Sequence, residues 1–372
     1  MATLNGKPVD RPAVSFYEIG GFDVNPADPD RFNIYNSPSW QPLLRLAEEE
    51  TDLIRMRAPE RRPVAHNDAS EFFKTETWEE GDSRFSRTTC KEAGRTMTAL
   101  SRRDAALDTT WEVEHLLKDV GDLRAYLELP DSVEDYDVDV SKMAAEEATL
   151  GERGIVMVDV GDPICQAAAL FSMADYTVVA LTEPELFHRL LQRFARPIME
   201  RTERVAREFP GHLWRIFGPE YATPPYLPPR LFDEYVVRYT GPMVEAVQRY
   251  GGFARIHCHG RIKEVMPLIM KMHPSGIDPI EPPHQGNVEL SYMRREYGRD
   301  LVLFGNIEIT DIENLDPSIF EARCRQSILD GTTGPGCGFV LMPSASPYGR
   351  EISRTTMANY RTMVRLVREM FA

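Results

Sequence analysis

Short apolar segments alternate with longer amphipathic segments along most of this chain. The apolar segments have the length of strands, and between them apolar residues recur every three or four positions, as on one face of a helix. Strands joined by helical crossovers form a parallel sheet. Eight strands are predicted at residues 12–18, 53–58, 154–160 and 213–217 and in the segments FARIHCHG, GIDPIEPP, DLVLFGN and GFVLMPSA.

This count favours a (β/α)₈ barrel, an α/β fold, over an open sheet. The predicted helices include one long segment, PELFHRLLQRFARPIMERTERVAREF, and the final segment TTMANYRTMVRLVREMF. The sequence contains neither a GxGxxG fingerprint nor a Walker loop, so dinucleotide and P-loop folds lack support.

Residues 68–103 follow a different pattern, in which polar and apolar residues alternate between glycines. Such alternation is typical of β-hairpins. We therefore expect an antiparallel insertion at about residues 65–115, within a single barrel domain that spans residues 1–372. Its aromatic residues suit either a small core of the insertion itself or a wall around a substrate. They are Phe72, Phe73, Trp78, Phe85 and Trp111.

Composition and charge argue against a nucleic-acid-binding, membrane-spanning or disulfide-rich protein. The formal net charge is −15, whereas nucleic-acid binding needs a basic footprint. No apolar run reaches the length of a membrane span, and the N-terminal residues lack the apolar region of a secretion signal. The five cysteines are scattered without CxxC spacing, so a disulfide framework is not expected. These features predict a cytoplasmic protein that binds neither nucleic acid nor membrane.

The segment GFARIHCHGRIKEV carries the strongest chemical signal. Residues i and i+2 of a strand point to the same side, so His257 and His259 should leave the strand end together. Active sites of barrels lie at the carboxyl ends of their strands. Further polar residues stand at predicted strand ends or just beyond them, and they are Glu18, Asp162, Glu220, Glu281, His284 and Asn306.

Two chemistries fit these residues. In the first, His257, His259 and Glu281 bind Zn²⁺, with Glu220 as a candidate fourth ligand. In the second no metal is present, and a cationic histidine and an arginine stabilise a carboxylate substrate or a developing anion.

The C-terminal half resembles the uroporphyrinogen decarboxylase superfamily, which includes cobalamin-dependent methyltransferases. The resemblance rests on GIDPIEPP, YGRDLVLFGNIE with its Gly305-Asn306 pair, GFVLMPSASP, and Met357-Ala358-Asn359 in the final helix. The opening NGKPVDRPAV is similar to the family's first segment. This resemblance implies a (β/α)₈ barrel, in agreement with the strand count.

The resemblance also indicates a branch. Tetrapyrrole decarboxylases carry an arginine-rich loop after the first strand, where this chain has residues 16–21, FYEIGG. Methyltransferases of the superfamily bind zinc through a histidine-x-cysteine pair and a late cysteine. Here the pair is His257-x-His259 and the late position is Ala345, while Cys337 precedes the strand. The set of His257, His259 and Glu281 is harder than the family's thiolate site and suits an oxygen leaving group.

The resemblance therefore implies a corrinoid-dependent methyltransferase of the O-demethylase type. It would move a methyl group from a small methoxylated substrate, for which an aromatic compound is one candidate, to the cobalt of a separate corrinoid protein, assisted by zinc. The chain has no DxHxxG motif, so cobalamin would be carried by that partner. A homodimer is expected by analogy with the family.

In this interpretation the side chains have separate roles. The catalytic residues are Glu220, His257 and Glu281, and the substrate-binding residues are Glu18, Asp162, His284 and Asn306. One alternative is a decarboxylase of a carboxylated substrate, for which Arg255 or Arg350 would supply the positive charge. The other is a barrel without catalysis that binds a small ligand or a partner.

Overall fold

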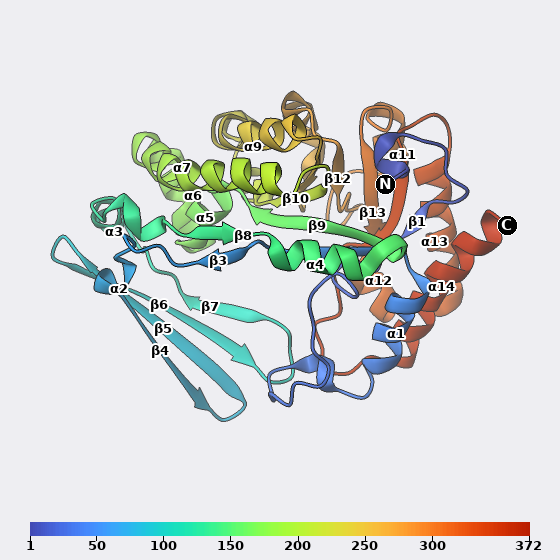
Figure 1. Cartoon of the computed structure of the whole chain (residues 1–372), viewed down its shortest axis with the longest axis horizontal. Helices are drawn as coiled ribbons and strands as arrows, with labels where there is room; N and C mark the ends of the chain where they lie inside the picture. The colour runs from blue at the N-terminus through green and yellow to red at the C-terminus, as the bar shows by residue number, and fades with distance from the viewer.

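The computed structural model covers residues 1–372, and its centre is one curled sheet of eight parallel strands (Figure 1). The strand order is β1-β14-β13-β12-β11-β10-β9-β2, and backbone hydrogen bonds link the two edges. Asp52 N donates to Val14 O at 2.7 Å, and Met56 N donates to Gly21 O at 3.0 Å. The predicted (β/α)₈ barrel and all eight predicted strands are confirmed. The strands are β1 (Ala13–Val14), β2 (Leu53–Arg57), β9 (Gly154–Gly161), β10 (Leu213–Phe217), β11 (Phe253–His257), β12 (Gly276–Asp278), β13 (Val302–Ile307) and β14 (Phe339–Pro343).

Most of the helices cover the outside of the sheet with an apolar stripe. In the long helix α7 the buried residues Leu190, Phe194 and Ile198 recur every fourth position and face the strands. The helices are α1 (Gln41–Glu50), α2 (Ala69–Phe72), α3 (Val120–Tyr126), α4 (Ser141–Leu150), α5 (Pro163–Ala169), α6 (Met173–Thr182), α7 (Pro184–Glu208), α8 (Pro229–Phe232), α9 (Arg238–Arg249), α10 (Met266–Ile269), α11 (Leu290–Glu296), α12 (Ile309–Asn314), α13 (Pro317–Thr332) and α14 (Arg354–Met370).

The core has two parts, one on each side of the sheet. The larger part lies between the strands and the helices. The smaller part fills the inside of the barrel and includes Tyr17, Met157, Phe304 and Met342. No helix of the structure combines the length and the apolarity needed to cross a lipid bilayer.

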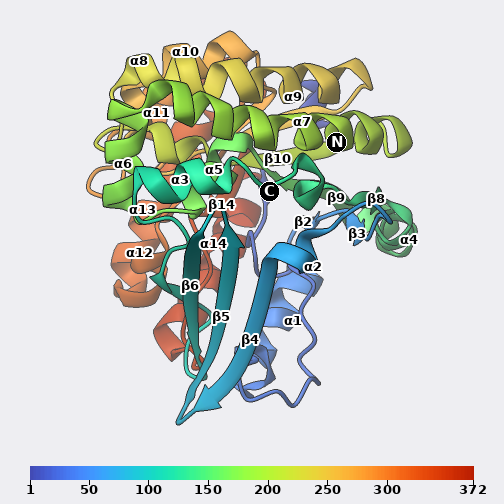
Figure 2. The ribbon, with the colours of Figure 1, turned by 90° about the vertical axis from the view of Figure 1, so that its left-hand side faces the viewer.

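The predicted antiparallel insertion is also confirmed. Its strand order is β4-β5-β6-β7, and Figure 2 shows the sheet standing below α3 and α5. A two-stranded ribbon of β3 and β8, which was not predicted, lies between β2 and β9 in the sequence. The strands are β3 (Glu60–Arg62), β4 (Phe73–Glu80), β5 (Ser83–Glu92), β6 (Arg95–Asp104), β7 (Thr110–Glu114) and β8 (Asp137–Asp139).

The insertion is attached to two loops at the carboxyl end of the barrel. After β14, Tyr348 O accepts a hydrogen bond from Asp108 N at 2.8 Å. After α5, Leu170 O accepts one from Leu117 N, also at 2.8 Å. Because both loops follow the carboxyl ends of barrel strands, the insertion spans one side of the barrel mouth.

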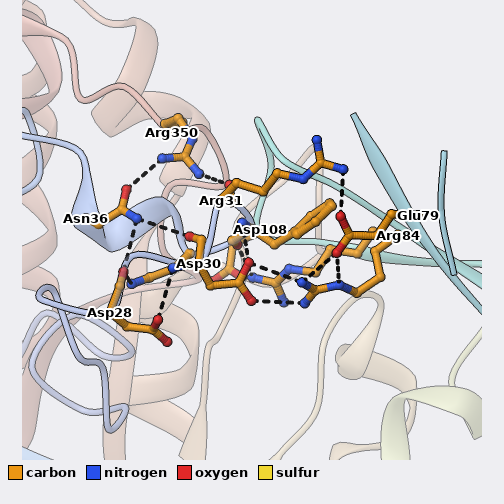
Figure 3. A network of polar contacts seen from close by, with 11 residues as sticks. Asp28, Asp30, Arg31, Asn36, Glu79, Arg84, Asp108 and Arg350 are labelled. Carbon is orange, nitrogen blue, oxygen red and sulfur yellow. Dashed lines mark hydrogen bonds and ion pairs between the residues drawn. The ribbon is translucent and has the colours of Figure 1, made fainter. Parts of the chain in front are cut away.

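A network of ion pairs ties the insertion to the N-terminal loop (Figure 3). Arg84 of β5 lies between Asp30, at 3.0 Å, and Glu79, at 2.9 Å. Arg350, in the loop after β14, donates to Asn36 Oδ1 at 2.8 Å and also to the carbonyl oxygen of Arg31. These contacts position the insertion as a fixed wall.

The insertion's aromatic residues divide between two environments. Phe72 and Phe73 pack against the main core. Trp78 and Phe85 stack on each other, with ring centroids 5.4 Å apart, and Trp111 is 47% exposed. The aromatic residues therefore do not form a single wall.

Candidate active site

The candidate site lies at the carboxyl ends of β10, β11 and β12, three neighbouring strands. Their register places Phe217, His257 and Asp278 side by side at these ends. Cys258 is buried in the helix-facing core, so the chain turns between the two histidines. The imidazole centroids of His257 and His259 are 4.6 Å apart, and the rings are nearly perpendicular, at 85°.

His257 is held by a buried carboxylate. Its Nδ1 lies 2.8 Å from Asp278 Oδ2, and Asp278 Oδ1 lies 2.9 Å from Arg255 Nε. Arg255 and Asp278 have no solvent exposure. Burial raises the pKa of Asp278, but the Arg255 charge and then His257 lower that pKa to about 2 overall. The ionised carboxylate thus keeps the proton of a neutral His257 on Nδ1 and leaves Nε2 as a free acceptor.

A second carboxylate holds His259. Its Nδ1 lies 2.7 Å from Glu281 Oε1, while Glu281 Oε2 accepts the Gly260 N–H at 2.6 Å. Burial alone lowers the pKa of His259, but the hydrogen bond and charge of Glu281, with the charge of Glu220, raise it above the ordinary value. By contrast, burial and the Arg215 charge lower the pKa of His257 to about 3. The pKa values of these two adjacent imidazoles are therefore shifted in opposite directions, that of His257 towards the neutral form and that of His259 towards the protonated form.

Behind the histidines the barrel interior carries a second ion pair. Arg215 Nη1 of β10 lies 2.8 Å from Asp159 Oδ1 of β9. The ring of Tyr17 lies against both Arg215 and Arg255, at 5.5 and 5.9 Å, and stacks beside His257. Each buried arginine thus has its own aspartate.

Glu220 and Glu281 line the rim near His259. Glu220 Oε2 accepts the Gly218 N–H at 3.0 Å, and burial raises the pKa of Glu220. Gly218 has φ of 126°, and a Cβ there would lie 2.1 Å from Asp162 Oδ1, so the turn that places Glu220 requires glycine. A cleft of about 320 Å³ is lined by Glu220 and His259 together with Met173, Tyr221, Tyr226 and Arg261.

Two further acids extend this rim. Ser346 donates to Glu18 Oε2 through its hydroxyl, at 2.6 Å, and its backbone N–H, at 3.2 Å. Glu308 follows β13, is only 7% exposed and has no partner for Oε1, while Ser344 donates to Oε2 at 3.1 Å. Burial, together with the Glu281 charge, raises the pKa of Glu308 to about 7.

The structure places three of the expected substrate-binding residues in other environments. Asp162 is completely buried, and its oxygens accept hydrogen bonds from Cys165 N and Thr240 Oγ1. It is a helix cap with no exposed surface for substrate. Asn306 points to the helix layer, where its Oδ1 accepts a hydrogen bond from Ser327 of α13. His284 lies exposed in the loop after β12 and makes no hydrogen bond.

The proposed zinc ligands do not converge as a set of three. Glu281 uses one oxygen for His259 and the other for the backbone, so it supports an imidazole instead of facing a metal. No group of three or more His, Cys, Asp or Glu side chains is arranged to hold a metal ion. The residues therefore do not fit a three-ligand zinc site in this arrangement, and zinc stays a prediction.

Sequence reasoning missed Asp278, Arg215 and Glu308. Asp278 stands in the segment GIDPIEPP, whose later acid, Glu281, was taken for the strand end. A signal was present, since Asp278 directly follows Ile277 in an apolar strand. Arg215 and Arg255 occupy the same register position of neighbouring strands, a pairing that the sequence does not state.

Comparisons with known proteins agree with this fold. No curated protein matches the chain. A solved structure described as a methyltransferase from Methanosarcina mazei superposes with a TM-score of 0.61 at 14% identity, covering 100% of this chain and 97% of that one. At this identity the likeness concerns the fold alone. The family model of uroporphyrinogen decarboxylase (URO-D) matches residues 112–370, well over half of the chain. The chain therefore belongs to the uroporphyrinogen decarboxylase family.

Proposed function

We propose that this protein is a methyltransferase that moves a methyl group from a small methoxylated substrate to the corrinoid of a separate protein. The observation that carries the proposal is the pair of carboxylate-held histidines, whose pKa values are shifted in opposite directions, at the mouth of a barrel of this family. Breaking a methyl–oxygen bond leaves negative charge on oxygen, and a positioned proton donor stabilises that charge.

His259 is suited to be the proton donor. Glu281 holds Nδ1, so the Nε2–H of the imidazolium is the free donor beside the cleft. As the methyl–oxygen bond breaks, this proton would pass to the leaving oxygen, and solvent would later restore it. Neutral His257 would accept a hydrogen bond through Nε2, and Glu220 would orient the substrate in the cleft.

When a partner protein presents its corrinoid, that group would supply the nucleophile that accepts the methyl group. The rest of the task falls to this chain, which binds the donor, excludes water and delivers the proton. The insertion wall beside the mouth suits this role because it is held by the ion pair of Arg84 with Asp30 and by the hydrogen bond from Arg350 Nε to Ala105 O.

The charge of the mouth argues against a substrate rich in carboxylates. Glu220 lines the cleft and Glu281 and Glu308 lie near it, and like charges repel. Arg261 also lines the cleft, and it lies 3.7 Å from Glu264. The two arginines that a decarboxylase would use are occupied. Arg255 is fully buried against Asp278, and Arg350 bonds to the insertion and the N-terminal loop.

The test uses free cob(I)alamin as the acceptor and a panel of methoxylated phenols as donors. We expect a demethylated phenol and methylcobalamin in equal amounts, seen by mass spectrometry and by the change in cobalamin absorbance. His259→Gln should reduce the rate at least 100-fold, which is the usual scale of general acid catalysis. His273→Gln is the matched control and should keep the wild-type rate, because His273 is exposed, has no side-chain hydrogen bond and lies outside the cleft.

Two results would contradict the proposal. One is that no donor in the panel loses its methyl group, with free cobalamin or with a corrinoid protein. The other is that His259→Gln demethylates as fast as the wild type. Release of carbon dioxide from a carboxylated substrate by the same preparation would favour the decarboxylase alternative.

A further inference from the structure

A second cavity, of about 250 Å³, lies apart from the histidine cleft. It is bounded by β9, β10 and α7 and covered by the ribbon of β3 and β8, which runs below α7 in Figure 1. No residue that lines this cavity also lines the cleft of His259. Its apolar wall includes Phe194, Pro197, Ile198, Val205, Trp214 and Phe217.

Two arginine side chains contact the ring of one tyrosine at the edge of this cavity. The guanidinium carbons of Arg61 and Arg201 lie 4.5 and 3.9 Å from the centroid of the Tyr136 ring. Neither arginine forms an ion pair, and Arg201 Nη1 donates only to the carbonyl oxygen of Glu134, at 3.2 Å. Burial lowers the pKa of Arg201, and the charge of Arg61 adds to this effect. The two cations repel each other, and only the more distant charges of Glu134 and Asp135 offset this repulsion at Arg201.

The acids that line the cavity already have partners of their own. Asp159 pairs with Arg215 at 2.8 Å. Glu134 Oε1 accepts the Tyr126 hydroxyl at 2.7 Å and lies 3.7 Å from Arg193 Nε. Arg61 and Arg201 thus have no acid paired with them directly, in a chain whose net charge is −15.

We propose that this cavity binds a small apolar monocarboxylate, and that this site is separate from the one used for methyl transfer. The carboxylate would lie at the edge of the cavity that Arg61 and Arg201 line, because guanidinium groups match its planar shape and charge. The body of the ligand would lie against Phe194, Ile198 and Trp214. The volume is at the low end for a ligand pocket, so a single ring is the size that fits.

The experiment titrates the full chain with 4-fluorobenzoate, observed by fluorine NMR, and repeats the titration with 4-fluorobenzamide. We expect saturable binding of the acid and at least tenfold weaker binding of the neutral amide. Arg61→Gln and Arg201→Gln should each weaken binding of the acid at least tenfold. Arg207→Gln is the matched control, because Arg207 is an exposed arginine on the same helix and lies outside the cavity.

Several outcomes would overturn the proposal. The proposal is wrong if the wild type shows no saturable binding, if acid and amide bind equally, or if binding is unchanged in both arginine variants. Loss of binding in His259→Gln would also overturn it, because the ligand would then occupy the other cleft. Arg201 contacts the backbone, so its variant could lose stability, but Arg61 is exposed and its variant keeps the test valid if the melting temperature is unchanged.

Discussion

Replacing Asp278 by asparagine should destabilise the protein and disable His257. Asp278 and Arg255 are both without solvent exposure, and their side chains meet at 2.9 Å. An asparagine has nearly the same shape but no charge, so the guanidinium would lose its counter-ion inside the barrel. Breaking a buried ion pair by removing one partner costs about 3–5 kcal/mol. For a chain of this length that cost corresponds to a fall of about 4–6 °C in the melting temperature.

The assay is thermal unfolding followed by circular dichroism, together with the demethylation rate. Arg255→Met in the Asp278→Asn background should recover part of the lost stability, since it removes the unpaired charge. The demethylation rate should stay low in both variants, because no carboxylate then fixes the proton of His257 on Nδ1. The control is Asp300→Asn, at an exposed aspartate that forms no ion pair, which should change stability by less than about 0.5 kcal/mol.

The reasoning would be refuted if Asp278→Asn melted within about 1 °C of the wild type, a change that corresponds to less than about 1 kcal/mol. It would also be refuted if adding Arg255→Met to the Asp278→Asn variant lowered its stability further. Either result would mean that the barrel interior admits enough water to solvate the guanidinium, so that the pair of Arg255 and Asp278 contributes little.

Three further predictions concern protonation and metal. Glu281→Gln should move the alkaline limit of the demethylation rate to lower pH, because Glu281 raises the pKa of His259 and the protonated form is the donor; an unchanged pH profile would exclude His259 as that donor. Burial raises the pKa of Asp162 to about 7, whereas an unfolded aspartate titrates at about pH 4. The protonated carboxyl therefore contributes to the stability of the folded protein below about pH 4, and this contribution is lost as the pH rises through 7. Asp162→Asn keeps a good helix cap but cannot ionise. Between pH 5 and pH 8 the free energy of unfolding, measured by urea titration, should fall in the wild type by about 2–3 kcal/mol more than in this variant. Equal falls in both proteins would contradict the burial argument. Because Glu281 is engaged with His259, zinc should bind weakly. Elemental analysis after dialysis against a mild chelator should find well under one zinc per chain. One tightly held zinc that is lost in His257→Ala would instead show that Glu281 turns to the metal.

Local sequence was sufficient to predict most of the fold. Apolar runs such as GIVMVDVG and the stripe of α7 have the periods of a buried strand and an amphipathic helix, and these periods depend only on neighbouring residues. The spacing of His257 and His259 likewise placed both imidazoles at one strand end. The ribbon of β3 and β8 was missed, because its strands have three residues each and lie far apart in the chain.

The candidate site was predicted only in part. Asp162 and Asn306 both stand at strand ends, as expected, but one is buried as a helix cap and the other faces α13. Which way a polar side chain points at a strand end depends on contacts with distant elements. The sequence alone does not contain those contacts.

The sequence by itself determined the parallel eight-stranded barrel, the antiparallel insertion and the meeting of two histidines at its mouth. The tertiary structure decided the chemistry of those histidines. Asp278 and Glu281 lie on the neighbouring strand and in its following loop, more than twenty residues away, and only strand register brings each carboxylate to its imidazole. Since pKa values depend on burial and on charges within a few ångströms, the pKa of His257 is lowered and that of His259 is raised only once the barrel has closed.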